Sequence, residues 1–418
     1  MNVLIKSAII IDKKSEFNST TQDILVENGI IRKIGNSLKN PGNFQEINLD
    51  NLHASPGWFD SSVCFGEPGY EDRETIKNGL DVAAFSGFSV VALNANTDPI
   101  IDTRSGVIFV KEKSKTTATK LLPIGALTIQ SEGQYLAEVY DMHRAGSTAF
   151  GDYKKPISNP NTLKIGLLYV ANFNGLVQSF PQNLELSQNS VMNENITSTT
   201  LGLKGSPELA ESIQVARDLE ILEYSNGKLH IPTISSAKSV DLIRSAKAKG
   251  LDVSCSVAIH NLILRDSDIK NYNTHFKVNP PLRTQHSIDA LLEGIKDGTI
   301  DMVTSDHNPI TVENKKVEFD FADFGTIGLE SAFGALNSIF STQLTVELLT
   351  KGKTRFGIPE SSINIGNPCD ITLFNPKVKH TFGNEHILSK SKNSIFIGQK
   401  LHGRVYGVLA NNVMKLNL

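Results

Sequence analysis

The chain has 418 residues, of which 39% are hydrophobic and 20% are charged, a composition typical of a folded globular protein rather than a disordered or fibrous one. The formal net charge is −3 at pH 7, and no basic segment predicts a nucleic-acid partner. The three cysteines form no CxxC pair, which argues against a disulfide framework and a thiolate zinc site, and no apolar run reaches about 18 residues. We therefore expect a cytoplasmic protein without a membrane or nucleic-acid partner.

The first 52 residues have a β pattern. Residues 3–11 are an almost continuous apolar run, which predicts a strand. Residues 23–26 and 30–34 flank Glu27-Asn28-Gly29. Asn-Gly favours the type I′ turn of a two-residue hairpin, because both residues tolerate positive φ. We therefore predict a hairpin here.

From residue 56 onward, short apolar runs alternate with helical patterns. The clearest helix is expected after Ser206, its predicted cap, with Pro207 in the first turn and apolar residues such as Leu209 and Ile213 following at helical spacing. Alternation of strands and helices over about 300 residues predicts a parallel α/β fold, and a closed (β/α)₈ barrel over residues 53–362 fits this length. The runs predicted to be strands are residues 89–93, 165–170, 229–234, 251–257 and 300–304.

The β pattern returns at residue 363. Residues 369–376 form an apolar run bounded by turn residues, and residues 398–418 alternate and contain several glycines. Because both ends of the chain are β-rich, we predict that residues 1–52 and 363–418 together form one small β-sandwich domain. Residues 183–206 are polar and rich in Asn, Ser and Thr, and we predict a long loop over one face of the barrel.

Four segments carry the most specific motifs of the chain. They are Pro56-Gly-Trp-Phe-Asp-Ser-Ser-Val-Cys-Phe-Gly-Glu-Pro-Gly69 with residues 71–76, then residues 87–99, then Lys277-Val-Asn-Pro-Pro-Leu-Arg283, and finally Asp297-Gly-Thr-Ile-Asp301 with Ser305-Asp-His-Asn-Pro309 and Gly325-Thr-Ile-Gly-Leu-Glu330. In this order they resemble the dihydroorotases, in particular the type found with multifunctional pyrimidine enzymes. The resemblance implies an amidohydrolase-type distorted (β/α)₈ barrel with a β-sandwich built from both termini, which agrees with the pattern described above. It also implies zinc-dependent, reversible closure of N-carbamoyl-L-aspartate to dihydroorotate.

The resemblance implies four histidine ligands for zinc, and this chain has none of them. The family's His-x-His pair corresponds to Ser62 and Cys64, whose side chains alternation directs to the same side of the first barrel strand. The two later histidines correspond to Phe180 and Thr233, while His230 matches a family histidine that is not a ligand. Cys64 could bind metal as a thiolate, but a lone cysteine is more often a small buried hydrophobic residue.

Two carboxylates of the family's metal site remain. Asp152 corresponds to the aspartate that bridges the metals in this branch of the family, and Asp306 corresponds to a metal ligand and general base. The alternative for Asp306 is a carboxylate held by hydrogen bonds at a strand end. Catalytic zinc sites use about three protein ligands, so two carboxylates alone predict that no metal is bound.

The family positions that contact substrate are also partly lost. Gly66 stands where the family has an arginine that grips the substrate carboxylate, and Ile310 stands in place of a late histidine. Glycine offers no substitute for a bidentate guanidinium group. Asn96 and Asn279 match family substrate-binding positions, although capping of loops and strand ends is their structural alternative.

No other catalytic pattern replaces the lost site. The ten histidines include no HxH, HxxH or HxxxH pair, and only His380 and His386 lie close together. His260 is predicted to be a structural histidine with satisfied hydrogen bonds. The sequence has no GxSxG, Walker or GxGxxG motif in a suitable context.

Three functions are consistent with these observations. The first is a catalytically inactive dihydroorotase homologue that forms homo-oligomers and supports aspartate carbamoyltransferase, a partner implied by the resemblance alone. The second is an active cyclic-amide hydrolase with a divergent metal site made from Cys64, Asp152 and Asp306. The third is a binding protein that uses the former active-site pocket for another small molecule.

Overall fold

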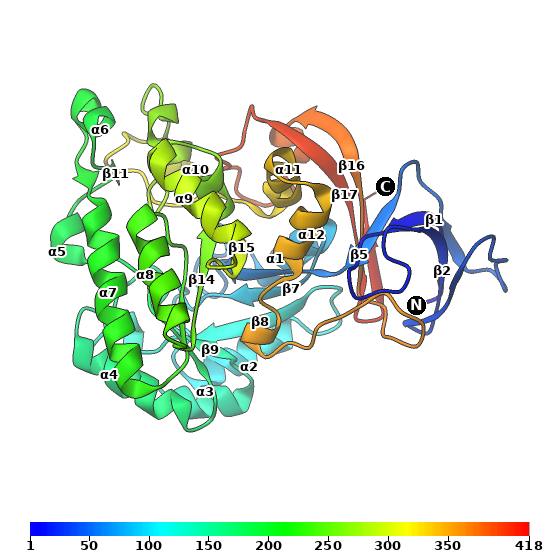
Figure 1. Cartoon of the computed structure of the whole chain (residues 1–418), viewed down its shortest axis with the longest axis horizontal. Coiled ribbons are helices and arrows are strands. Elements are labelled where there is room, and N and C mark those ends of the chain that lie inside the picture. Colours follow the sequence, from blue (N-terminus) through cyan, green and yellow to red (C-terminus); the bar gives the residue numbers. More distant parts are fainter. Residues whose placement is uncertain (418) are drawn as a thin grey trace.

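The computed structural model describes residues 1–417, and its central part is a barrel of eight parallel strands (Figure 1). The strands lie in chain order around the sheet. A parallel bridge between Val63 and His307 joins the first strand to the segment that follows the last strand, and the Cys64 amide donates to the His307 carbonyl oxygen at 2.8 Å. The (β/α)₈ prediction is therefore confirmed. The strands are β6 (Trp58–Val63), β7 (Phe88–Leu93), β8 (Lys120–Gly125), β9 (Ala149–Phe150), β10 (Leu176–Gln178), β13 (Leu229–Ile231), β14 (Val253–Ala258) and β15 (Met302–Thr304).

Helices follow the barrel strands. Among residues 1–417, none of them combines the length and the apolar character that a membrane crossing needs. The longer helices are α1 (Ile76–Phe85), α2 (Arg104–Lys113), α3 (Val139–Ala145), α4 (Pro160–Ala171), α7 (Glu208–Ser225), α8 (Ala237–Ala248), α9 (Gln285–Lys296), α11 (Leu329–Ile339) and α12 (Thr342–Thr350).

The strand predicted at residues 165–170 is wrong, because these residues lie within helix α4. Asn159 caps the helix and Pro160 occupies its first turn. Leu163 and Leu167 are buried at helical spacing. The solvent-facing side of α4 is also apolar, as the exposed Ile165 illustrates. Apolar residues on both sides of the helix turn a helical pattern into a continuous run, which resembles a buried strand.

The helix predicted after Ser206 is confirmed as α7, but its start and its buried side differ from the prediction. Pro207 is the cap residue, and Ser206 belongs to the short strand β12 (Gly205–Ser206). Leu209 and Ile213 are 53% and 42% exposed, while the buried face of α7 includes Val215, Leu219 and Leu222.

The segment 183–206 was predicted to be a loop, and it contains short regular elements instead. Two short helices, α5 (Leu184–Ser187) and α6 (Ile196–Leu201), flank the strand β11 (Met192–Asn193), which pairs in parallel with β12. Asn183 and Asn195 accept hydrogen bonds from the backbone of the helices that follow them. The polar residues that suggested a loop are therefore in part helix caps.

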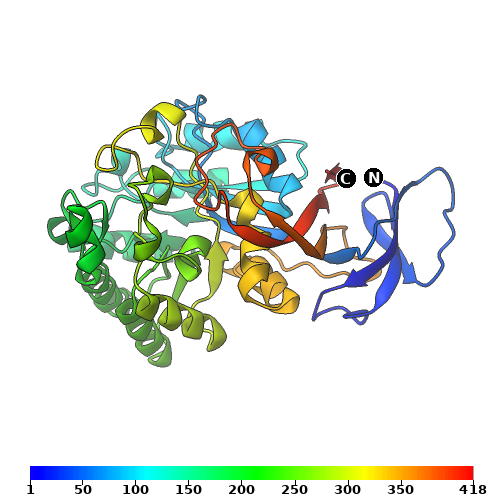
Figure 2. The ribbon, with the colours of Figure 1, turned by 90° about the horizontal axis from the view of Figure 1, so that it is seen from above.

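Strands from the two ends of the chain pair in one eight-stranded sheet, which projects from the side of the barrel (Figure 2). β16 pairs with β5, which pairs with β1. The predicted hairpin is confirmed: Glu27 pairs with Ile30 across Asn28 and Gly29, whose φ angles are 51° and 75°. The strands are β1 (Val3–Ile10), β2 (Thr21–Glu27), β3 (Ile30–Gly35), β4 (Gln45–Ile47), β5 (His53–Pro56), β16 (Ile371–Thr381), β17 (Lys400–Ala410) and β18 (Val413–Leu416).

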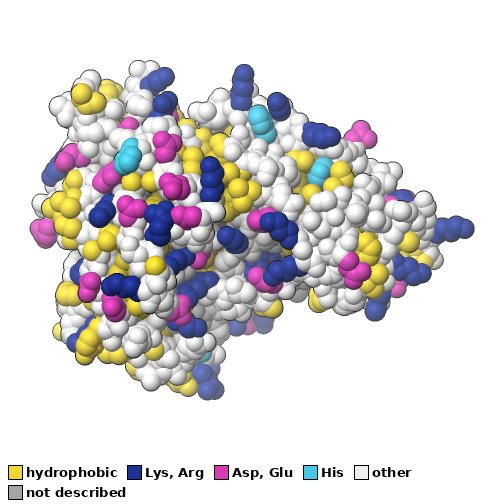
Figure 3. Space-filling model, viewed as in Figure 1, with side chains coloured by type: hydrophobic (Ala, Val, Ile, Leu, Met, Phe, Trp, Pro, Cys, Tyr) yellow, Lys and Arg dark blue, Asp and Glu magenta, His cyan; other side chains and the backbone are white. Residues whose placement is uncertain are grey.

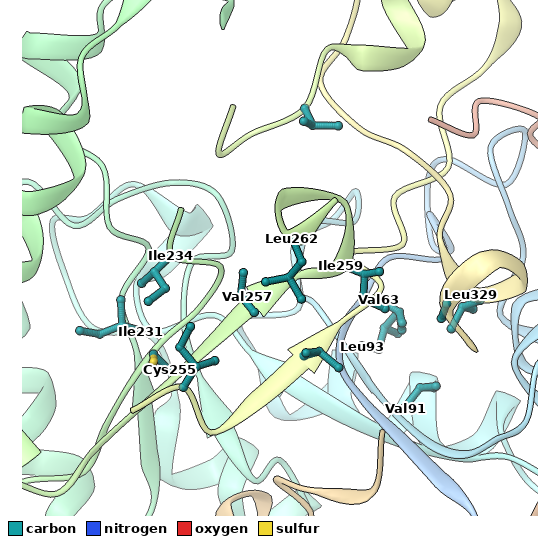
Figure 4. Packing of buried hydrophobic residues seen from close by; sticks show 14 of the residues in the cluster. Val63, Val91, Leu93, Ile231, Ile234, Cys255, Val257, Ile259, Leu262 and Leu329 are labelled. Atoms are coloured by element: carbon teal, nitrogen blue, oxygen red, sulfur yellow. The ribbon is translucent and has the colours of Figure 1, made fainter. Parts of the chain in front are cut away.

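Apolar side chains of the barrel strands pack between the strands and the helices and inside the barrel (Figure 4). Ile231 of β13 and Val257 of β14 are 0% exposed, as is Val63 of β6. This core holds the strand ends in fixed positions, and the loops that carry the candidate site start from these ends.

We predict that Ile231→Ala lowers the free energy of unfolding by about 2–5 kcal/mol, because it leaves a cavity in a closed core. The measurement is equilibrium unfolding in urea. Ile196→Ala, at a side chain that is 82% exposed, is the matched control and should change stability by less than about 0.5 kcal/mol. Equal effects of the two substitutions would contradict the assigned core.

Candidate active site

The candidate site lies at the carboxyl ends of the barrel strands, where active sites of this fold are built. The positions that correspond to metal ligands in the family follow five different strands. All of them are buried, with exposed fractions between 1% and 6%. They are Ser62 and Cys64 at the end of β6, Asp152 after β9, Phe180 after β10, Thr233 after β13 and Asp306 after β15.

Ser62 and Cys64 share one hydrogen-bond partner. The Asn94 side-chain amide donates to Ser62 Oγ at 3.0 Å and to Cys64 Sγ at 3.7 Å. This common partner confirms that both side chains lie on the same side of the chain. Burial raises the pKa of Cys64 to about 11, so the side chain is a thiol rather than a thiolate at neutral pH.

Both carboxylate oxygens of Asp152 accept hydrogen bonds from the loop that follows β8. Its Oδ1 accepts hydrogen bonds from the backbone amides of Leu127 and Thr128 at 2.9 and 3.0 Å, and its Oδ2 accepts from Thr128 Oγ1 at 2.5 Å. Burial nevertheless raises the pKa of Asp152, and the hydrogen bonds from Thr128 and Leu127 oppose that rise. In this arrangement the carboxylate orders the loop after β8 rather than facing a shared metal.

The positions of the two later histidine ligands carry no metal-binding nitrogen. Phe180 is a buried apolar side chain, and Thr233 has a φ of 52° with its amide donating to Ser256 Oγ at 3.1 Å. Nearby His230 lies between the hydroxyls of Ser254 and Ser256, and burial lowers its pKa to about 3. His230 is therefore a neutral structural residue.

Asp306 forms an ion pair with Lys154, in which the carboxylate is buried and the lysine is partly buried. The Lys154 ammonium donates to Asp306 Oδ2 at 2.7 Å, and the two side chains are 12% and 1% exposed. Burial raises the pKa of the Asp306 carboxyl, and the charge of Lys154 opposes that shift. The Asp306 Oδ1 atom has no hydrogen-bond partner among residues 1–417. The structure therefore agrees with the alternative interpretation of Asp306, a carboxylate held in place by a hydrogen bond. The donor of that hydrogen bond is the charged Lys154.

Two further polar side chains, Tyr153 and His260, lie beside this pair. The Lys154 ammonium is 5.3 Å from the centroid of the Tyr153 ring, and its charge contributes to the depressed pKa of His260, which burial lowers to about 3. His260 is 0% exposed, and within the described residues neither of its ring nitrogens has a hydrogen-bond partner. The prediction that the ring nitrogens of His260 have hydrogen-bond partners is therefore wrong. The residues that surround this side chain are distant in the sequence, so the sequence did not show which groups it would meet.

The four positions expected to contact substrate make few side-chain hydrogen bonds. Asn279 donates to Gln182 Oε1 at 3.1 Å, whereas Asn96 is partly exposed. Gly66 has a φ of 75°, and a Cβ atom there would lie 2.4 Å from the Tyr70 carbonyl oxygen. Ile310 is buried, and its amide donates to Asn393 Oδ1 at 3.1 Å. The backbone at Gly66 therefore disfavours the family's arginine.

A cavity of about 440 Å³ lies beside Asn279, between the segment that contains α5 and β11 and the loop around Phe324. No charged residue lines this cavity, and none of the six metal-ligand positions does. His380 and His386 come together elsewhere, on the terminal sheet, with ring centroids 4.7 Å apart.

The residues present at the family's metal position do not fit zinc. Serine, threonine and phenylalanine are not suitable ligands, Cys64 is a thiol, Asp152 is hydrogen-bonded to Thr128, and Asp306 already holds a cation. Among residues 1–417, no group of three or more His, Cys, Asp or Glu side chains has the arrangement to hold a metal ion.

Comparison with solved structures shows which proteins share this fold. The barrel with its attached sheet is shared with solved structures of the amidohydrolase fold: the L-hydantoinase (dihydropyrimidinase) from Arthrobacter aurescens has a TM-score of 0.85 at 19% identity over 99% of this chain and 95% of that one. A dihydropyrimidinase from Brevibacillus agri has a TM-score of 0.81 at 20% identity over 100% and 96% of the two chains.

At the level of sequence, a family model described as dihydro-orotase-like matches residues 54–239. The dihydroorotase of Acetivibrio thermocellus is 36% identical over 98% of this chain and 97% of its own length, and that of Ruminiclostridium cellulolyticum is 35% identical over 97% and 96%. The chain therefore belongs to the dihydroorotase family.

The functional feature that the sequence did not reveal is Lys154. It lies next to Tyr153 in a segment that family resemblance aligns with a metal ligand, but Asp306 is 152 residues away. No sequence motif links two residues so far apart along the chain, so only the folded structure reveals this ion pair.

We predict that Asp152→Ala lowers the free energy of unfolding by about 1–3 kcal/mol, because two backbone amides and one hydroxyl lose their buried acceptor. Urea unfolding measures the effect, and the exposed Asp141 of α3 provides the control variant Asp141→Ala. A structural role also requires that the loss be the same with and without a metal chelator. A stability loss that appears only without chelator would instead assign Asp152 to a metal.

Proposed function

We propose that this dihydroorotase-family protein does not catalyse dihydroorotate formation and acts as a non-catalytic partner in pyrimidine biosynthesis. The observation that carries the proposal is the ion pair between Lys154 and Asp306. A general base has to reach the reacting proton directly or through one water molecule. The Asp306 carboxylate is 1% exposed on its side chain and is paired with an internal ammonium.

The charges around the site also support the proposal. The family substrate, N-carbamoyl-L-aspartate, carries two carboxylates and needs positive groups to hold them. The charge of Lys154 is neutralised by Asp306, the arginine position is Gly66, and among residues 1–417 no charged residue lines the 440 Å³ cavity beside Asn279. This arrangement lacks both the activated water and the grip on the substrate that the reaction requires.

The direct test is dihydroorotase turnover in both directions, measured beside the metal content of protein purified without chelator. We expect turnover at the background level and no stoichiometric zinc. The dihydroorotase of Acetivibrio thermocellus, prepared in the same way, serves as the active reference. Saturable turnover that zinc restores after chelation would overturn the proposal in favour of an active cyclic-amide hydrolase.

Restoring the four histidines should not restore the reaction. We predict that the variant Ser62→His, Cys64→His, Phe180→His and Thr233→His gives no efficient turnover, because Gly66 and Ile310 still leave the substrate carboxylate unheld. Adding Gly66→Arg should destabilise the protein instead of helping, since φ is 75° and the Tyr70 carbonyl blocks a Cβ atom. Appreciable turnover by the four-histidine variant, assayed with dihydroorotate as substrate, would contradict this prediction.

The proposed role is structural, with homo-oligomers and aspartate carbamoyltransferase as partner. Two observations support it. The chain keeps a closed barrel although the catalytic side chains are replaced, and most random substitutions would have destabilised an unused fold. Hydrophobic side chains also face solvent on the side of the barrel that α4 and α7 form (Figure 3). On α4, Ile165, Leu168 and Tyr169 are 44%, 44% and 45% exposed at helical spacing, as in a helix that packs against a second protein surface.

The partnership is tested at native abundance. We expect aspartate carbamoyltransferase to co-purify with this protein and to lose activity or assembly size when the gene is deleted. Leu168→Lys with Tyr169→Lys should shift the oligomer toward smaller species in light scattering, whereas Ile196→Lys, at the exposed end of α6, should not. A carbamoyltransferase that stays fully active in an assembly of unchanged size after deletion would refute the scaffold role.

A further inference from the structure

We infer that the ammonium group of Lys154 is a built-in replacement for the family's metal cation: it supplies the positive charge that Asp306 needs and keeps divalent metal away from this carboxylate. The inference rests on the proposed loss of the metal site, and it goes further by naming the residue that maintains that loss. It concerns stability and metal affinity rather than turnover.

The first step is the position of Lys154 in the barrel. Lys154 follows β9, whereas Asp306 follows β15. Three strands separate β9 from β15 in the sheet, namely β10, β13 and β14, and three more separate them in the other direction, namely β8, β7 and β6. The two strands therefore lie on opposite sides of the barrel. An ion pair between residues that follow them has to span the centre of the barrel mouth.

The chain between β9 and Lys154 is shaped for this purpose. Asp152 is anchored to Thr128, and Tyr153 has a φ of 51°, which turns the backbone sharply before Lys154. The lysine side chain then runs inward and is only 12% exposed, so that its ammonium lies beside Tyr153 and 2.7 Å from Asp306 Oδ2. Its neighbour Lys155 has an exposed side chain without an ion pair among the described residues. Of these two adjacent lysines, only Lys154 places its ammonium inside the barrel mouth.

The second step is electrostatic. A buried carboxylate without a counter-charge is strongly destabilising, and breaking a buried ion pair costs more than its formation contributes. Asp306 Oδ1 has no hydrogen-bond partner within residues 1–417, so the contact with Lys154 carries most of the compensation. The second buried carboxylate nearby, Asp60, is held by Thr304 and Ser305 and adds negative charge to this region. A positive charge is therefore required at the barrel mouth, and Lys154 provides it.

The third step is competition between two cations. A divalent metal bound to Asp306 would lie about 2.0–2.2 Å from a carboxylate oxygen. The Lys154 ammonium is already 2.7 Å from an oxygen of the same carboxylate. Two cations on one buried carboxylate repel each other strongly, because the interior screens charge poorly. Restored histidine ligands alone should consequently bind metal weakly while Lys154 is present.

The stability experiment uses thermal unfolding of the full chain. Lys154→Met should lower the melting temperature by at least about 5 °C, and the double variant Lys154→Met with Asp306→Asn should regain most of that loss. Lys155→Met, which removes the adjacent exposed ammonium, is the matched control and should leave the melting temperature unchanged. A Lys154→Met protein as stable as the wild type, or a double variant no better than Lys154→Met, would overturn the inference.

The metal experiment compares the four-histidine variant with and without Lys154→Gly, titrated with zinc and measured by metal analysis and by thermal shift. We expect at least a tenfold gain in zinc affinity when Lys154 is removed. Equal affinity in both backgrounds would refute the exclusion of metal. These results are separate from the proposed function: turnover by the wild-type protein would contradict the inactive role, whereas loss of the Lys154 effects in an inactive protein would contradict this inference alone.

Discussion

A parallel barrel is stable only if its last strand meets its first, because every free strand edge would leave backbone groups unpaired. In this protein the closing contact joins the end of β6 to the segment after β15, through the Val63–His307 bridge and the hydrogen bond from Cys64 to His307. The buried Asp60 strengthens the same junction by accepting hydrogen bonds from Thr304 and Ser305. Closure determines which loops face one another across the mouth, and the rest of the candidate site depends on it.

Closure also concentrates polar side chains in a space with little water. Asp306, Lys154, Tyr153 and His260 come from three strands and meet above the same apolar core. In such surroundings an unpaired charge destabilises the folded state strongly. The buried carboxylate of Asp306 therefore needs a positive group beside it, whether or not it takes part in catalysis. An ammonium on a flexible stem needs only one carboxylate, whereas a zinc ion needs about three suitable ligands. A lysine is therefore a simpler means than a metal ion of balancing the charge of a single buried carboxylate.

The comparisons show that the fold of this chain is shared with proteins of much lower sequence identity. The chain is 36% identical to the Acetivibrio thermocellus dihydroorotase over almost the whole length of both proteins, and it shares its architecture with hydantoinases at 19% identity. Those similarities concern the strands, the helices and the sheet formed by both termini. The side chains at the ends of the strands are a separate property, since function resides in sites carried by a fold and not in the fold itself.

The sequence by itself determined the barrel, the hairpin at Asn28-Gly29 and the β-rich ends, because these depend on local patterns and on the order of motifs. It misassigned residues 165–170, where apolar residues on both faces of α4 concealed the helical period. Only the tertiary structure decided that Asp152 orders a loop, that His260 is buried with no hydrogen-bond partner among residues 1–417, and that Lys154 reaches Asp306. Each of these depends on how residues that follow different strands are placed in space, and such placement leaves no periodic trace in the sequence.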